Sequence, residues 1–273
     1  REAFDKALEL LQPGRSQAVR LANAFIKLDE LELAYATYTK AQSLGTTDFH
    51  YEFANLQGMR RDFQGMVESF LELLHTKPNY LVTVQNSLNR NLRLQTEPDN
   101  GELVRIALLR AAKKYPEDNI YPEMLVWHFT QKKDFASAFI HARAIDLRVE
   151  GIGLKVMGLG NTAAANKDLK TAIDCYEYVA SKGKDTPYFY TARNELLQVR
   201  FHSLTKQIPL NIESLETLAV DYSFSIEDLG VKAETAIMLK NRAHLLAFFL
   251  GRGNEAIELM EEVLAISGLN ERI

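Results

Sequence analysis

The feature that most constrains the fold of this 273-residue chain is a segment that returns at a fixed interval. The sequence KDFASAF at 133–139 recurs 34 residues later as KDLKTAI at 167–173. Self-similarity at an interval of this size is typical of proteins built from stacked structural repeats. The pair therefore predicts a repeated unit, provided that the same phase extends along the chain.

The phase extends over most of the chain as a triplet: one apolar residue, a second four positions later and a third three positions further on. The second residue of successive triplets is Phe4, Tyr38, Phe70, Leu108, Ala142 and Tyr176. The steps between these residues are 34, 32, 38, 34 and 34 positions. Random helices do not hold one phase through five steps, so the pattern predicts a real repeat.

Another apolar stripe precedes each triplet, with the i, i+3, i+4, i+7 spacing of one helical face. Ala18, Leu21, Ala22 and Phe25 give one example, and the stripe beginning at Val156 gives another. The repeating unit is therefore a helical hairpin, whose apolar faces are buried only by stacking on neighbouring hairpins. Small residues at Ala22, Ala54 and Gly160 allow the two helices of a hairpin to approach closely.

These residues resemble the tetratricopeptide repeat, whose 34-residue pattern contains Leu-Gly, a Tyr, an Ala, an aromatic residue and a closing Pro. The closest copy is Leu159-Gly160, Ala172 and Tyr176, and Pro78 and Pro116 supply the closing proline of two other units. The resemblance is strong over about 1–186 and weaker over 237–269, and no unit has the Trp of the family pattern. It implies an all-α, right-handed superhelix (solenoid) of helical hairpins; Sel1 and HEAT repeats fit these steps less well.

We predict a repeat array over 1–186 and a divergent region over 187–273 that ends in another hairpin of this type. The extra residues between Phe70 and Leu108 fall in QTEPDNGE at 95–102, which predicts a turn between helices. In the divergent region we expect helices over about 187–206 and 212–222. Ser225 and Asp228 then predict a capping box that opens the next helix.

At the other end, Arg1–Leu11 matches the second helix of a hairpin whose first helix is missing. We therefore expect more repeats to precede this segment in the full protein. The single cysteine, Cys175, excludes an intramolecular disulfide framework. It suits a cytoplasmic or a periplasmic protein and does not fix the compartment.

Composition argues against two classes of partner. A net charge of −4 shows no basic excess, and nucleic-acid binders gain most of their affinity by neutralising phosphates. No stretch approaches the roughly 20 apolar residues of a membrane-spanning helix. We therefore expect neither nucleic-acid binding nor membrane insertion by this segment.

Motifs for catalysis and for cofactors are also missing. The six histidines do not fall in HExxH or in zinc-ligand spacings. The run GIGLKVMGLG at 151–160 lacks both GxGxxG spacing and a preceding strand. We therefore expect a protein that is not an enzyme, with no metal and no cofactor.

A binding surface is the remaining expectation. In proteins similar to this family, the first helix of each hairpin lines a concave groove that receives a peptide. The ninth position of each unit is Asn23, Asn55, Trp127 or Asn161, and Asn offers both a donor and an acceptor. Other positions predicted to face the groove are Lys27, Tyr51, Met59 and Gln131. A clamp for a terminal carboxylate needs a Lys where this chain has Val19, so the sequence gives no support for one.

Alternatives remain for both the residues and the function. The asparagines bridge adjacent helices or face water equally well, and Trp127 suits a core as well as an interface. The favoured function is a non-catalytic scaffold for a protein or peptide partner. The alternative is a regulatory or sensory segment of a larger enzyme or signalling protein. Catalysis in the divergent region, within 187–236, ranks third.

Overall fold

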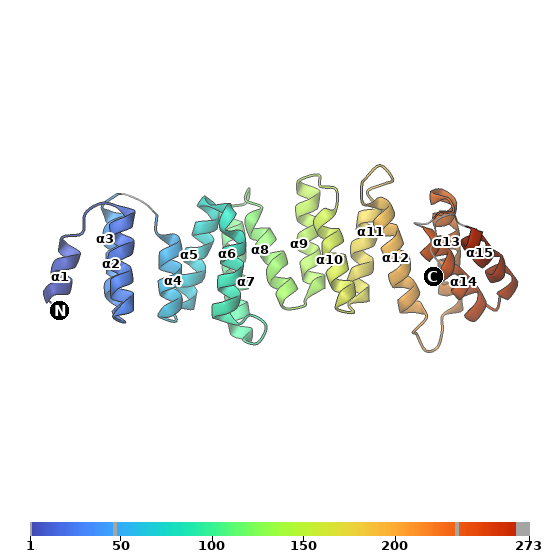
Figure 1. Ribbon diagram of the computed structural model, residues 1–273, viewed down its shortest axis with the longest axis horizontal. Helices are drawn as coiled ribbons and strands as arrows, with labels where there is room; N and C mark the ends of the chain where they lie inside the picture. Colours follow the sequence, from blue (N-terminus) through green and yellow to red (C-terminus); the bar gives the residue numbers. More distant parts are fainter. Residues whose placement is uncertain (1, 46–47, 233–234, 266–273) are drawn as a thin grey trace. The chain divides into compact units, whose positions relative to one another are not determined.

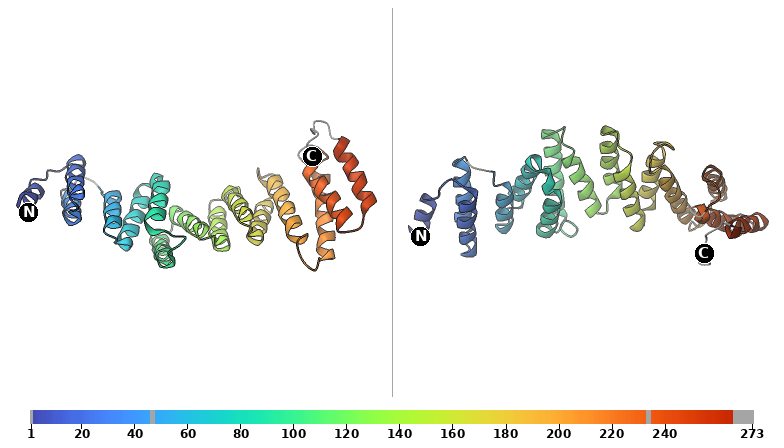
Figure 2. Two further views of the ribbon diagram at one scale, coloured as in Figure 1. Left: turned by 60° about the horizontal axis from the view of Figure 1, so that its bottom comes forward. Right: turned by 45° about the horizontal axis from the view of Figure 1, so that its top comes forward.

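The computed structural model describes residues 2–45, 48–232 and 235–265, and over these ranges the chain is helical with no β-strand (Figures 1 and 2). The predicted all-α class is confirmed. The chain forms two compact units, Arg1–Lys132 and Lys133–Ile273, and each is described by itself below. The predicted boundary near residue 186 stays a prediction.

The first unit contains eight α-helices and a short 3₁₀ helix among its described residues. They are α1 (Glu2–Glu9), α2 (Arg15–Lys27), α3 (Leu31–Ser43), α4 (His50–Met59), α5 (Phe63–Thr76), η1 (Pro78–Tyr80), α6 (Leu81–Leu92), α7 (Pro98–Lys114) and α8 (Ile120–Gln131). Helices that follow one another pack together: α2 on α3, α4 on α5, and α7 on α8. A helix is found over most of Arg1–Leu11, as expected.

The second unit contains seven α-helices among its described residues. They are α9 (Phe135–Arg148), α10 (Leu154–Ala165), α11 (Leu169–Ala180), α12 (Phe189–Leu204), α13 (Ile212–Leu229), α14 (Ala236–Phe248) and α15 (Gly253–Ala265). Consecutive helices again pack on one another, and Figures 1 and 2 show α14 and α15 side by side. The helix expected over 187–206 is α12, whereas α13 continues to Leu229, seven residues beyond its expected end.

The repeated Lys-Asp pair stands at the start of a helix, α9 in one copy and α11 in the other. Lys133 and Lys167 adopt left-handed backbone conformations, with φ of 57° and 67°. Asp134 and Asp168 are the N-caps of α9 and α11, and each side chain accepts a hydrogen bond at 3.1 Å from the backbone N–H three residues later. The likeness between the two segments therefore reflects one shared way of reversing the chain and starting a helix.

Two hairpins of the first unit reverse in the same way. Asp29 and Arg61 have φ of 60° and 59° at the corresponding position, and Asp62 caps α5 by accepting from the N–H of Gly65 at 3.0 Å. A non-glycine residue with this backbone conformation is uncommon. Its return at matching places in four turns is an independent sign that the hairpins are repeats of one unit.

Packing inside a hairpin depends on a small residue facing a large one, as predicted. In the hairpin of α10 and α11, a Cβ atom placed on Gly160 would lie 2.8 Å from the ring of Tyr176 and 2.9 Å from Cβ of Cys175. Tyr176 is 1% exposed. The missing side chain at position 160 therefore creates the space that the aromatic ring of the second helix fills.

Two predictions about local structure are wrong. The segment 95–102 is not all turn, because Pro98 begins α7 and the three residues after it lie in its first turns. Proline suits this place because its missing N–H would have no partner at a helix start. Ser225 does not open a helix: it lies buried within α13, where its hydroxyl donates to the carbonyl of Asp221 at 2.8 Å and accepts from Nε of Arg193 at 2.7 Å.

A buried carboxylate joins three helices of the second unit. Asp146, near the end of α9, accepts hydrogen bonds from the Gly153 N–H at 2.9 Å and the Tyr178 hydroxyl at 2.8 Å. Nζ of Lys182 lies 2.6 Å from the same carboxylate. Burial alone would raise the pKa of Asp146, but these hydrogen bonds outweigh burial and hold the pKa below its ordinary value of 3.8.

We predict opposite effects for two alanine substitutions on α10. Gly160→Ala is expected to lower the free energy of unfolding by about 1–3 kcal/mol, because the new methyl group overpacks against Tyr176. Gly158→Ala has open space around it and is expected to raise stability by about 0.5–1 kcal/mol through helix propensity. Urea unfolding followed by circular dichroism measures both, and equal stabilisation by the two changes would contradict the packing described.

We also predict a pH-dependent loss on removing the charge of Asp146. Because the folded-state pKa is depressed, the carboxylate contributes its full stabilisation above pH 3.8, and this contribution is lost as the pH falls through the folded-state pKa. Asp146→Asn should lower the free energy of unfolding by about 1–3 kcal/mol at neutral pH. The difference from the unsubstituted chain should shrink below pH 3.8, whereas the exposed control Asp185→Asn should show little effect at any pH.

Candidate binding surface

The residues predicted to bind a partner lie on four helices. In the first unit they fall on α2 (Asn23, Lys27), α4 (Tyr51, Asn55, Met59) and α8 (Trp127, Gln131). In the second unit Asn161 lies on α10. These side chains differ in exposure and in hydrogen bonding. Some are exposed and make no hydrogen bond to another described residue, whereas others bond to or pack against the rest of the protein.

In the first unit, three of the predicted residues are exposed: Asn23, Lys27 and Met59, the last with 55% of its surface accessible. No hydrogen bond from their side chains to another described residue is found. Asn23 follows the fully buried Ala22, so its amide points away from the contact that closes the hairpin. These three side chains of the first unit are therefore available to a binding partner.

Two asparagines at the ninth position make hydrogen bonds within the protein, Asn55 inside its own helix and Asn161 to the next helix. The Asn55 amide donates to the carbonyl of Tyr51 at 2.8 Å, and the Asn161 carbonyl oxygen accepts from the Tyr176 hydroxyl at 2.8 Å. Burial raises the pKa of Tyr176 to about 12, so this hydroxyl stays protonated as a donor at neutral pH. Each amide therefore keeps one half, the carbonyl of Asn55 or the NH₂ of Asn161, for another partner.

The structure adds an asparagine that the sequence analysis missed. On α6, Val84, Ser87 and Leu88 form the buried stripe, and Asn89 follows at the place that Asn23 and Asn55 hold on α2 and α4. Asn89 lies 34 residues after Asn55, and this interval would have been sufficient to find it. Leu88 replaces the small residue of the other hairpins, which hid the match.

The remaining predicted residues pack against the rest of the first unit. Trp127 is half-buried and contacts the hydrophobic cluster formed by α4–α8. Tyr51 is half-buried too, with its ring centroid 5.8 Å from that of Tyr80 and 6.4 Å from that of Phe70. Gln131 accepts a hydrogen bond from the Asn89 amide at 3.2 Å, which ties α8 to α6. Trp127 therefore serves mainly the core.

A hollow of about 510 Å³ lies beside Met59, where α4 and α6 end. The helix ends come close at Gly58: a Cβ atom placed there would lie 3.5 Å from Oδ1 of Asn91 and 2.9 Å from the sulfur of Met66. This approach brings side chains that are distant in sequence to one hollow. Its charged lining consists of Arg61, Arg90, Arg93 and Glu97.

The arginines of this hollow have no acidic partner among the described residues. Arg61, Arg90 and Arg93 are all exposed, and no carboxylate of the described residues comes within ion-pair distance of any of them. The neighbouring amides are already engaged, because Asn91 donates to the Ser87 carbonyl at 2.7 Å and Asn100 to the Leu92 carbonyl at 2.9 Å. The guanidinium groups are therefore the charged donors of the hollow, and they supply most of its free N–H groups. We call these three arginines and the space between them the arginine hollow.

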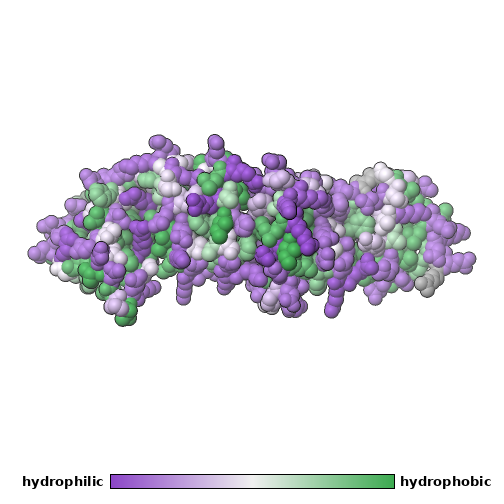
Figure 3. Space-filling view, turned by 180° about the vertical axis from the view of Figure 1, so that it is seen from behind, coloured by the Kyte–Doolittle hydropathy of each residue, from purple (hydrophilic) through white to green (hydrophobic). Residues whose placement is uncertain are grey.

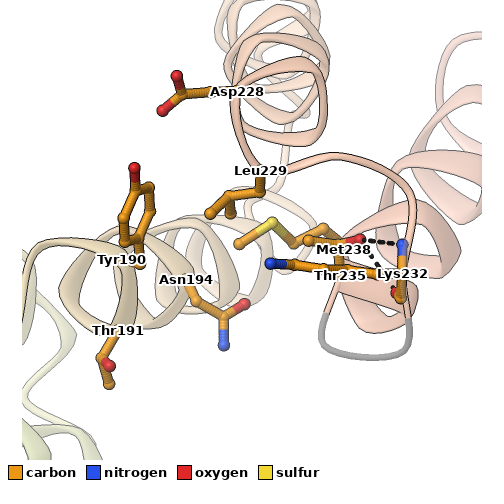
Figure 4. A pocket seen from close by; sticks show the side chains of 8 residues that line it. All are labelled: Tyr190, Thr191, Asn194, Asp228, Leu229, Lys232, Thr235 and Met238. Atoms are coloured by element: carbon orange, nitrogen blue, oxygen red, sulfur yellow. Dashed lines mark hydrogen bonds between the residues drawn. The ribbon is translucent and has the colours of Figure 1, made fainter. Parts of the chain in front are cut away.

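The second unit has a hollow of about 420 Å³ with a different character, between α12, α13 and α14 (Figure 4). Figure 4 shows the side chain of Lys232 extending toward Asn194, whose buried Oδ1 has no hydrogen-bond partner among the described residues. The hydroxyl of Thr235 accepts from the N–H of Lys232 at 3.0 Å and donates to the carbonyl of Gly230 at 2.7 Å. This hollow is lined by neutral polar and apolar side chains, with one acidic residue, Asp228, and one basic residue, Lys232.

The wider surface is also mixed. On the face shown in Figure 3, hydrophobic side chains form separate patches between hydrophilic ones. Within the described part of the chain, no helix is both long and apolar enough to cross a membrane. Over the same residues, no group of three or more His, Cys, Asp and Glu side chains is arranged to hold a metal ion.

Comparison with known proteins assigns the chain to no family: no protein-family model matches the sequence, and no curated protein matches it significantly.

Proposed function

We propose that this chain is a non-catalytic scaffold that binds a protein partner through an extended peptide segment. The proposal takes the hairpins to be tetratricopeptide-like repeats that wind into a right-handed superhelix, with the first helices lining its concave side. The observation that carries it is the return of Asn at one position of successive first helices, at Asn23, Asn55 and Asn89 and again at Asn161.

The chemistry of the amide supports this role. An extended peptide presents backbone N–H and C=O groups at regular intervals, and a carboxamide can donate to one and accept from the other. Asn is also a poor helix former, so its repeated use inside helices has a cost in stability. Asn23 has both halves of its amide available, whereas Asn55 and Asn161 each keep one half.

The turns support the repeat architecture on which this surface depends. Asp29, Arg61, Lys133 and Lys167 share one left-handed backbone conformation, and three of these turns are followed by a capping Asp. Hairpins closed by the same turn and packed through the same kind of contact present their first helices in the same way. A superhelix with one peptide-lining side is the arrangement that such repeats form.

The test is a selection of peptides from a random display library on the whole chain, followed by affinity measurements with the selected peptides. Asn23→Ala, Asn55→Ala and Asn161→Ala are each expected to raise the dissociation constant about threefold to tenfold, because each removes one or two hydrogen bonds. Fluorescence anisotropy with labelled peptide measures this change.

The matched control is Asn86→Ala, which removes an exposed amide from α6 outside the repeating position. It is expected to leave affinity unchanged. Failure to select any peptide would overturn the proposal, as would selected peptides whose affinity is insensitive to all three repeat-position variants.

A further inference from the structure

We propose that the arginine hollow binds the oxyanions of an acidic peptide, that is, carboxylate or phosphoryl groups on the side chains of the bound segment. This inference rests on the proposed peptide-binding function and deepens it by naming the chemistry of the partner. The site lies at the ends of α4 and α6, apart from the recurring asparagines, and it is lined by Arg61, Arg90 and Arg93.

The charge of the hollow is the first argument. Three arginines face one carboxylate, Glu97, in a protein whose net charge is −4. Elsewhere in the first unit, several basic groups are paired with a carboxylate: Arg60 with Glu32 at 2.8 Å, Lys114 with Glu72 at 2.6 Å and Lys77 with Asp48 at 3.0 Å. The three arginines differ from single exposed cations because they line one space together, with no ion-pair partner among the described residues.

The residue type is the second argument. A guanidinium group presents a planar fork of N–H donors that matches a carboxylate or phosphoryl group, and such charge-assisted pairs are about twice as strong as neutral hydrogen bonds. The amides of Asn91 and Asn100 each donate to a backbone carbonyl and carry no charge, so they compete only weakly with the guanidinium groups for an anion. The hollow therefore selects for anions rather than for neutral polar groups.

The backbone is the third argument. Arg61 (φ 59°) and Arg93 (φ 48°) occupy left-handed conformations at the ends of α4 and α6. Glycine would fit both positions with less strain. Long cationic side chains at both places, beside Arg90, surround one space of about 510 Å³. That volume lies within the range of sites for small ligands, so it accommodates a few acidic side chains.

The hollow also lies next to the predicted binding surface. Met59, exposed on the last turn of α4, lines it, and Asn55 is one helical turn earlier on the same helix. A peptide segment that bonds to Asn55 therefore needs only a short extension to place an acidic side chain among the arginines.

The test measures binding of four probes to the whole chain: a short glutamate-rich peptide, its glutamine counterpart, a phosphoserine peptide of matched length and inorganic phosphate alone. Both acidic peptides are expected to bind, the glutamine peptide at least about tenfold more weakly, and raising the salt concentration should weaken the acidic peptides. Tighter binding of the phosphoserine peptide would assign the oxyanion to phosphoryl groups, and equal binding would show that carboxylates suffice.

Substitutions then locate the site. Arg61→Gln, Arg90→Gln and Arg93→Gln are each expected to raise the dissociation constant of an acidic peptide about threefold to tenfold. Arg110→Gln removes an exposed charge from α7 outside the hollow and should have no effect. Arg93→Lys keeps the charge without the planar fork and should retain part of the affinity. Circular dichroism spectra and melting curves verify that each variant is folded.

Three outcomes would overturn the inference. They are acidic peptides that do not bind, inorganic phosphate as the only probe that binds, and affinities for acidic peptides that the three arginine variants leave unchanged. These results are distinct from failure of the proposed function. If peptides selected from a random library bind while the acidic probes do not, the scaffold proposal stands and the oxyanion proposal fails. If no peptide of any kind binds, both fail.

Discussion

The contact between a small residue on the first helix and an aromatic ring on the second is the interaction that closes the hairpin of α10 and α11. At Gly160 the ring of Tyr176 occupies the space that a side chain would fill, so the two helix axes come close. A buried tyrosine hydroxyl also needs a hydrogen-bond partner. Asn161, the next residue on the first helix, supplies that partner, and the packing contact and the proposed binding position are therefore neighbours in sequence.

This arrangement explains why the recurring asparagines have two roles. Asn55 and Asn161 use half of their amides within the protein, and the bond fixes the orientation of the other half. An oriented group loses less conformational freedom when a ligand binds, so the internal bonds prepare the surface for recognition. The sequence left open whether the asparagines bridge adjacent helices, and Asn161 does so through its bond to Tyr176. This bridging role is compatible with peptide recognition, because half of the amide stays available.

The parts of the fold that depend on local sequence were predictable. The Lys-Asp turn, the apolar stripes and the small residue at Gly160 each reflect an interaction within about one hairpin, and each is found. Asn89 on α6 was missed because Leu88 replaces the small residue. The capping box at Ser225 was wrong because a buried contact with Arg193 continues the helix through it.

The arginine hollow could not be predicted in this way. Arg61 is separated from Arg90 and Arg93 by about thirty residues, and only the close approach of α4 and α6 at Gly58 unites them. Sequence alone presents these arginines as ordinary cations near helix C-termini, where they complement the helix dipole. Their lack of acidic partners is visible only when the neighbouring side chains are placed.

The most direct test of the account is photo-crosslinking of a selected peptide to the chain. Benzoylphenylalanine replaces, one at a time, the exposed Asn23 and Met59 on first helices and the exposed Glu68 and Leu109 on second helices. The account predicts crosslinks from positions 23 and 59 and none above background from positions 68 and 109. Equal crosslinking from the second helices, or none from the first, would contradict it.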